Sequence, residues 1–392
     1  MSRGASGKAL ARTLALSWAV LLGGCAHPPP NNAAPTLRLV GTYQLAPDLR
    51  VDDTLVGGIS GMDYDAARDE WWLASDDRGQ HAPARLYRAR MTFKAAGIER
   101  MALSAAVILR QPDGAPYPAW GTPGVSADIE ALRIDPRDGA IWLTSEGDRK
   151  AKVPSFVRRV DADGRHVGEL PYPAALQIRP DCECGGRSNL GMEGMAFTPD
   201  GTALWLALEA SPIQDGPPPA PGQGALTRVS LVKRDGSMMA QYAYPLDAAP
   251  TPAIVGGFVD NGVSEILALG GERLLVLERA GRQRTGKHFD FDVRLYEVDL
   301  AQASRLDPAL PLGQQLDALR PAAKRLLFDS ARLPPGWSDN YEAMAWGPRL
   351  KSGNPALVLA SDNNFNGGPT RFLVFDIGSL NGGNREAEVV RD

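Results

Sequence analysis

The sequence predicts an all-β fold, and most specifically a β-propeller built from five four-stranded blades. The first observation is a hairpin unit that occurs five times: two short apolar strands joined by a turn, with a polar residue at the start and a carboxylate at the end. Successive units begin 70, 63, 72 and 77 residues apart, which is too long for a solenoid repeat and suits a blade with its loops. The second observation is the content of 42 glycines and 32 prolines, which indicates many turns and few long helices.

The unit over residues 189–211, NLGMEGMAFTPDGTALWLALEAS, shows the pattern most clearly. Pro199-Asp200-Gly201 supplies the fixed φ and the positive φ that a chain reversal needs. Because the start of one antiparallel strand lies beside the end of the next, Glu193 and Glu209 should emerge at the same edge. The other four units cover residues 60–76, 130–146, 265–278 and 342–362.

The remaining strands complete the blades. Eight are expected after the first four hairpins, at residues 85–93, 100–110, 156–161, 166–170, 226–233, 238–244, 293–300 and 324–329. The fifth hairpin is followed only by residues 371–377, and the segment 37–45 has no partner of its own. Pairing these two would close the ring and leave no exposed edge. A sixth blade remains possible, because residues 245–262 and 301–323 are long enough to contain weak strands. Alternating apolar residues place Trp71, Trp72 and Trp142 in the blade core.

The N-terminal residues 1–25 have the features of a lipoprotein signal peptide. Three basic residues precede a short apolar run, which ends in the lipobox Leu22-Gly23-Gly24-Cys25. The apolar run is shorter than the roughly 20 residues that a membrane span needs. We therefore expect lipidation at Cys25, a Pro/Asn-rich tether at 26–36, the propeller at 37–380 and a polar tail at 381–392. The protein would be exported and anchored by its lipid, facing the periplasm, at the outer membrane.

Net charge limits the partners. The chain carries a formal charge of −4 at pH 7 with both signs well mixed, so no basic surface points to nucleic acid. We expect a small anionic substrate, contact with a membrane only through the N-terminal lipid, and a monomer.

The hairpin units also predict where the chemistry lies. The first two strands of each blade are the inner ones, so the polar residues at their shared edge would gather around one mouth of the central channel. Many like charges cannot all stay ionised there unless a cation neutralises them. The residues expected to bind the cation are Glu130, Glu193, Glu265 and Glu342. Those expected to orient or deprotonate a water molecule are Asp76, Glu146, Glu209, Glu278 and Asp362.

The donor types indicate which cation to expect. Carboxylate oxygens without histidine favour Ca²⁺, with Mg²⁺ as the alternative, over zinc or copper. A single carboxylate of this kind is usually a solvated strand end, and it is the recurrence in five units that favours a metal site. Arginines near these carboxylates could cradle a phosphate or carboxylate, although each could equally be the ion-pair partner of a neighbouring acid. They are Arg78, Arg149, Arg187 and Arg279.

The cysteines and histidines give weaker signals. Cys182 and Cys184 could form a small disulfide or remain two thiols in a loop, and zinc-like spacing is missing around them. The histidines after the tether lack a matching nucleophile or ligand motif, so we expect surface or core positions for them. They are His81, His166 and His288.

Four blocks together resemble a known family. GISGMDYDAARDEWWLASDDR, SADIEALRIDPRDGAIWLTSEGDR, NLGMEGMAFTPDGTALWLALEAS and DNYEAMAWG followed by LVLASDNNFN are similar to the bacterial phytase-like family, described as the "esterase-like activity of phytase" domain. The resemblance extends over about residues 37–377. It implies an exported β-propeller related to the calcium-dependent propeller phytases, with hydrolysis of phosphoesters or esters as its activity.

These observations predict a metal-dependent hydrolase of phosphoesters. The carboxylates would hold the metal and activate water, and the arginines would offset charge on the phosphoryl oxygens. Two alternatives remain open at this stage. One is a propeller that binds a ligand or protein without turnover and contains a structural calcium, and the other is a lactonase-like esterase with the same metal and carboxylates.

Overall fold

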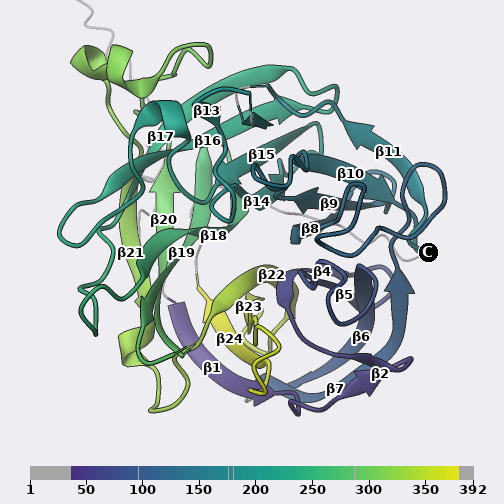
Figure 1. Ribbon diagram of the computed structural model, residues 1–392. Coiled ribbons are helices and arrows are strands. Elements are labelled where there is room, and N and C mark those ends of the chain that lie inside the picture. The colour runs from purple at the N-terminus through teal and green to yellow at the C-terminus, as the bar shows by residue number, and fades with distance from the viewer. Residues whose placement is uncertain (1–36, 96, 175, 180, 287, 379–392) are drawn as a thin grey trace, which may run out of the picture.

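The computed structural model describes residues 37–378, apart from residues 96, 175, 180 and 287. It shows five four-stranded antiparallel sheets arranged around a ring (Figure 1). The predicted signal peptide and lipidated Cys25, the tether at 26–36 and the tail at 381–392 all lie outside the described residues. No helix within the described part of the chain has the length and apolar character needed to cross a bilayer.

The first three blades each follow chain order from the inner strand outward. Blade 1 contains β4 (Ile59–Asp65), β5 (Glu70–Ser75), β6 (Arg85–Lys94) and β7 (Gly97–Ile108). Blade 2 contains β8 (Ile129–Ile134), β9 (Ile141–Ser145), β10 (Phe156–Val160) and β11 (His166–Leu170). Blade 3 contains β14 (Met192–Phe197), β15 (Ala203–Leu208), β16 (Ala225–Lys233) and β17 (Met238–Leu246).

The last two blades complete the ring. Blade 4 contains β18 (Val259–Gly270), β19 (Arg273–Gln283), β20 (Phe289–Asp299) and β21 (Ala323–Asp329). Blade 5 contains β22 (Tyr341–Arg349), β23 (Pro355–Ser361), β24 (Arg371–Ile377) and, as its outermost strand, β1 (Leu37–Gln44). β1 pairs antiparallel with β24 from Leu37 opposite Ile377 to Gln44 opposite Arg371. The predicted five blades and the closure of the ring by the N-terminal strand are therefore confirmed.

The long segments that allowed a sixth blade do not form one in the described residues. Residues 245–262 contain the end of β17 and the start of β18, and residues 301–323 contain the short 3₁₀ helices η2 (Leu312–Gln314) and η3 (Leu316–Ala318). Two further 3₁₀ turns, η1 (Ile213–Asp215) and η4 (Ser330–Arg332), lie in loops. The remaining strands are two-residue pairs: β2 (Arg50–Val51) with β3 (Thr54–Leu55), and β12 (Ile178–Arg179) with β13 (Cys184–Gly185).

Apolar side chains between neighbouring blades form the core. Trp71 of blade 1, for example, belongs to a cluster that also contains Ala343 and Phe372 of blade 5. Trp71 is 0% exposed, and Trp72 and Trp142 are also buried, which confirms their place in the blade core. Truncating a buried aromatic side chain of this kind to alanine typically costs about 3 to 5 kcal/mol.

The inner strands surround a channel that is filled beneath its mouth. Each of β4, β8, β14, β18 and β22 contacts the inner strand of the next blade, and β22 returns to β4. Arg133 extends from blade 2 and donates to the carbonyl oxygens of Met62 in blade 1 at 3.0 Å and Ile266 in blade 4 at 2.9 Å. Its Nη2 also lies 2.7 Å from Glu265 Oε2. Through these contacts the Arg133 side chain connects blades 1, 2 and 4.

Candidate functional site

Each inner hairpin carries a β-bulge at the same place. In blade 1 the register of β4 against β5 shifts between Ile59 and Gly61, and the other four blades shift at the corresponding point. A bulge adds one residue to one strand, re-aims a side chain and often occurs beside active sites. The residues that we call the bulge positions are Ser60, Glu130, Glu193, Ser264 and Glu342.

The second strand of each hairpin contributes a residue to the same edge. The backbone N–H of Asp76 donates to the carbonyl of Gly58 at 2.9 Å, and that of Glu146 donates to the carbonyl of Asp128 at 3.1 Å. An equivalent bond occurs within blade 3, from Glu209 to Gly191, and within blade 5, from Asp362 to Asn340. In blade 4 the equivalent residue, Arg279, is paired with Gly262. The residues that we call the end positions are Asp76, Glu146, Glu209, Arg279 and Asp362.

These positions bring together seven carboxyl groups, and Asp128, opposite Glu146, adds an eighth. We call these eight groups the acidic cluster. Donor oxygens of Asp128, Glu130 and Glu146 lie within 4.8 Å of one another, and so do those of Glu146, Glu193 and Glu209. Asp76, Glu342 and Asp362 interact electrostatically with one another on the other side of the ring. The acidic cluster comprises Asp76, Asp128, Glu130, Glu146, Glu193, Glu209, Glu342 and Asp362.

Two predicted site residues, Glu265 and Glu278, are not brought into the acidic cluster. Glu265 follows the bulge position and pairs with Arg133 below the mouth. Glu278 precedes the end position and accepts hydrogen bonds from Tyr244 Oη at 2.6 Å and Lys324 Nζ at 2.6 Å. The blade 4 bulge falls on Ser264, so each glutamate lies one residue away from the site. Seven of the nine predicted carboxylates do lie in the acidic cluster.

The four predicted arginines divide into two groups. Arg78 Nε lies 2.9 Å from Asp128 Oδ2. Arg279 lies 3.1 Å from Glu209 Oε1 and 3.0 Å from Asp260 Oδ2. Both guanidinium groups therefore form ion pairs with carboxylates at the mouth, which is the alternative that the sequence left open for each arginine.

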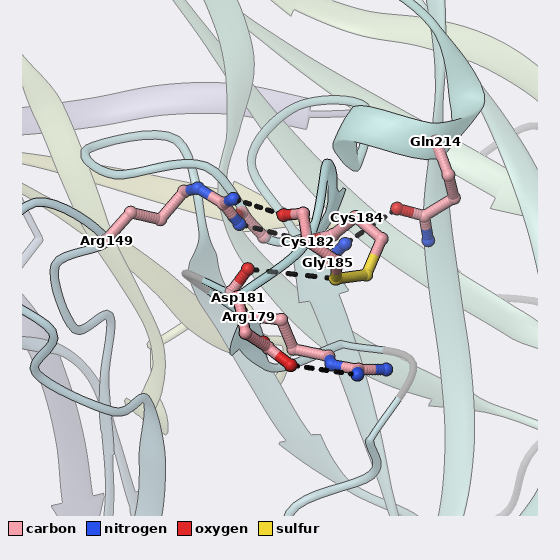
Figure 2. Close-up of a disulfide and its surroundings, with 8 residues drawn as sticks. Arg149, Arg179, Asp181, Cys182, Cys184, Gly185 and Gln214 are labelled. Carbon is pink, nitrogen blue, oxygen red and sulfur yellow. Dashed lines mark hydrogen bonds and ion pairs between the residues drawn. A yellow bond between two sulfur atoms is a disulfide. The ribbon is translucent and has the colours of Figure 1, made fainter.

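Arg149 and Arg187 instead bind loop carbonyl groups. Arg149 donates to the carbonyls of Cys182 at 2.6 Å and Cys184 at 2.8 Å, as Figure 2 shows. The two cysteines form a disulfide, one of the two states that the sequence allowed. Arg187 donates to the carbonyls of Ser211 and Gly216. These two arginines hold the loop before blade 3 in place and do not contribute their donors to the acidic cluster.

Burial dominates the electrostatics of the acidic cluster. Six of its members are at most 9% exposed, and two guanidinium groups can offset only two of eight negative charges. Burial, with the neighbouring carboxylates, raises the pKa of Glu130, Glu146 and Glu193 well above the usual range of a glutamate. Burial raises the pKa of Glu209 to about 8 and that of Asp362 to about 8. The acidic cluster therefore carries its full charge at neutral pH only where a cation compensates it.

One buried oxygen indicates where a cation fits. Asp128 is 5% exposed and its Oδ1 has no hydrogen-bond partner among the described residues. A buried polar atom without a partner is costly, whereas a metal ion would satisfy it. Calcium binds oxygens at about 2.3 to 2.6 Å, so ligand oxygens up to about 5 Å apart can share one ion. The two triads that meet at Glu146 satisfy this condition, and the cluster can therefore hold a metal ion.

Sequence reasoning missed Asp128 and Asp260. Asp128 lies opposite the end position Glu146 in its blade, where blades 1, 3 and 4 have glycine. The spacing of two residues before Glu130 was a usable signal, because alternate residues of a strand share a face. Asp260 is a partner of Arg279 and also accepts from the N–H of Gly281 at 2.6 Å. No such spacing marked Asp260, since its role depends on the arginine in the end position of blade 4.

Fold and site define a class of protein: a five-bladed β-propeller whose channel mouth carries a buried acidic cluster able to hold a metal ion. The chain matches the Phytase-like family, described as "Esterase-like activity of phytase", over residues 54–365. It belongs to this family. No curated protein matches the chain.

Solved structures with a similar arrangement share little sequence with the chain. An alpha-L-arabinanase from Penicillium chrysogenum is 11% identical with a TM-score of 0.40, over 83% of this chain and 80% of that one. A mannose phosphorylase from Leishmania mexicana is 11% identical with a TM-score of 0.41, over 86% of this chain and 89% of that one. No argument about activity rests on either.

Proposed function

We propose that the protein is a metal-dependent hydrolase of phosphoesters that acts at the acidic cluster. The observation that carries the proposal is the pair of carboxylate triads that share Glu146, one of which contains the buried Asp128, whose Oδ1 has no hydrogen-bond partner among the described residues. Membership of the Phytase-like family and the propeller fold support a phytase-like hydrolase. Calcium is the proposed metal, with magnesium as the alternative, because all the donors are oxygens.

The side chains of the site have different roles in the proposed hydrolysis. Asp128, Glu130 and Glu146 would hold the cation, with Glu193 and Glu209 beside them. A bound divalent cation polarises phosphoryl oxygens and lowers the pKa of a coordinated water. Burial and the neighbouring acids raise the pKa of Asp76 well above its usual range, so Asp76 accepts the proton of the attacking water once the charge of the bound cation keeps it ionised. Arg78 binds the phosphoryl oxygens through its guanidinium fork.

The test combines calcium binding and turnover. Calcium titrated into the purified protein should raise its unfolding temperature and support hydrolysis of p-nitrophenyl phosphate. Glu146→Gln, which alters both triads, should lose both responses. The matched control is Asp215→Asn, because Asp215 is a buried carboxylate that pairs with Arg228 away from the mouth. Calcium binding and turnover that survive Glu146→Gln would refute the proposal.

A binding propeller without turnover is the second candidate. The observation that favours it is the burial of the acidic cluster, which leaves little room for a substrate directly above most of its carboxylates. Calcium stabilisation without turnover of any phosphoester would support this candidate.

The proposal extends to where the protein acts. The lipobox at Cys25 supports an exported lipoprotein that faces the periplasm and acts as a monomer on small anionic molecules. Labelling with radioactive palmitate, compared with a Cys25→Ala variant, tests the anchor.

A further inference from the structure

A small pocket opens beside the acidic cluster. It has a volume of about 180 Å³ and its walls include Asp76, Arg78, Gln80, His81, Asn364 and Phe365. The pocket therefore joins one carboxylate and one arginine of the proposed site to a histidine that the proposed mechanism does not use. Three of its residues have a positive φ, 50° at Arg78 and 48° at Asn364 and Phe365. Such backbone costs about 1 kcal/mol or more per residue and tends to cluster at functional sites.

The ring of His81 is held on two sides. Its Nδ1 lies 2.9 Å from Asp77 Oδ1, and the ring stacks on Phe365 with centroids 4.2 Å apart. Asp77 is itself fixed, because it also accepts from the backbone N–H groups of His81 and Ala82 and from Arg85 Nη1 at 2.5 Å. Two contacts of this kind define the orientation of an imidazole.

The other ring nitrogen, Nε2, is available to a ligand in the pocket. With Nδ1–H donating to Asp77, Nε2 is the ring atom that can exchange a proton with a ligand, and within the described part of the chain no group bonds to it. The His81 side chain is 45% exposed and the Asp77 side chain 0%. This arrangement, a buried carboxylate that orients an accessible imidazole, is the one used in general acid–base catalysis.

We propose that His81 is a further catalytic residue, whose Nε2–H donates a proton to the leaving oxygen of a phosphate monoester of an ordinary alcohol bound in this pocket. The inference rests on the proposed function and names its substrate class. Asp77 is a positioning residue, which orients the ring and stabilises the imidazolium.

The proton balance is complete. The oxygen of the attacking water bonds to phosphorus, and the water's proton passes to Asp76. The phosphorus–oxygen bond to the alcohol breaks, and the leaving oxygen takes its proton from Nε2. The products are inorganic phosphate and the free alcohol. His81 regains a proton from solvent, and Asp76 releases one to it.

The charged groups around the ring come from one segment of blade 1. Asp77 contacts Nδ1 and is itself paired with Arg85, and Asp76 and Arg78 also line the pocket. From the segment after β23, the pocket walls are the neutral Asn364 and Phe365.

The test compares leaving groups. β-Glycerophosphate releases an alcohol that needs a proton, whereas p-nitrophenyl phosphate releases a stable anion. His81→Ala should lower kcat/KM for β-glycerophosphate about 100-fold or more, and for p-nitrophenyl phosphate less than about fivefold, because general acids typically contribute 10²–10⁴-fold. Added imidazole should restore part of the loss. His288→Ala, at an exposed histidine beyond β19, is the matched control and should change neither rate.

The results of this comparison distinguish a wrong role for His81 from a wrong proposed function. Equal loss for both esters, or no loss for either, in an otherwise active protein would overturn the role of His81 and leave the proposed hydrolase intact. A wild-type protein that turns over neither ester would overturn the hydrolase, and the role of His81 with it. Thermal unfolding of His81→Ala should match that of the wild type, because the side chain is half exposed.

Discussion

Neutralising one carboxylate of the acidic cluster should stabilise the metal-free protein. Glu209→Gln is the informative change, since burial raises the pKa of Glu209 from 4.5 to about 8. At pH 8 the unfolded protein has released this proton, whereas the folded protein either retains it or ionises the buried group at a cost; glutamine removes that penalty while keeping the size of the side chain. The same change should weaken calcium binding, because Glu209 belongs to one of the two triads.

The magnitude follows from the shift in pKa. One pKa unit corresponds to about 1.4 kcal/mol, so ionising Glu209 costs the folded state about 4 to 5 kcal/mol. Glutamine gives up the ion pair with Arg279, which keeps its contact with Asp260 at 3.0 Å. We therefore expect the free energy of unfolding at pH 8 to rise by about 1 to 3 kcal/mol in the metal-free variant.

The assay is denaturant unfolding at pH 8 with a chelator and again with saturating calcium. Ligand at 100 times its dissociation constant stabilises a protein by about 2.7 kcal/mol, so calcium should favour the wild type and cancel or reverse the difference in stability. Asp215→Asn is the control, and should destabilise by about 3 to 5 kcal/mol with or without calcium, because it breaks a buried ion pair. The reasoning is refuted if Glu209→Gln destabilises the metal-free protein as much as Asp215→Asn does.

Three further predictions concern the acidic cluster and the loop before blade 3. The pKa of Asp362 and of Glu209 is about 8 in the folded protein and about 4 in the unfolded protein. The folded state therefore keeps protons that the unfolded state has released, and the unfolding temperature of the metal-free protein should decrease as the pH rises from about 4.5 to 8. An unfolding temperature that stays constant over this range would contradict the prediction. Arg78→Ala should lower kcat/KM for phosphoesters about 10-fold or more, whereas Arg149→Ala, at an arginine that binds loop carbonyls, should lower the unfolding temperature and spare turnover of the folded protein. Reduction of the disulfide at Cys182 should likewise leave calcium affinity unchanged, because the loop is outside the acidic cluster; a tenfold loss of affinity would show otherwise.

The fold was predictable because its signals are local and repeated. Turns such as Pro199-Asp200-Gly201 and the alternation around Trp71 lie within a few residues of chain. The closure of the ring was predictable for a different reason: β1 and β24 were the strands left without partners, and an open edge is unfavourable.

The site was less predictable because it depends on register. Carboxylates at both strand ends located seven members of the acidic cluster, yet a bulge shifts register by one residue and leaves no mark in the sequence. In blade 4 the bulge and end positions are Ser264 and Arg279, and the glutamates selected for their charge, Glu265 and Glu278, each lie one residue closer to the hairpin turn. His81 was not predicted as a site residue, because its contact with Asp77 forms only when the turn after β5 folds.

The most direct test of the central claim is anomalous diffraction from crystals soaked in manganese chloride, as a stand-in for calcium. The account predicts a peak within about 2.0 to 2.6 Å of Asp128 Oδ1, shared with Glu130 and Glu146, and its loss in Glu146→Gln. No peak at the acidic cluster under saturating metal, with the carboxyl groups bonded only to one another and to water, would contradict it.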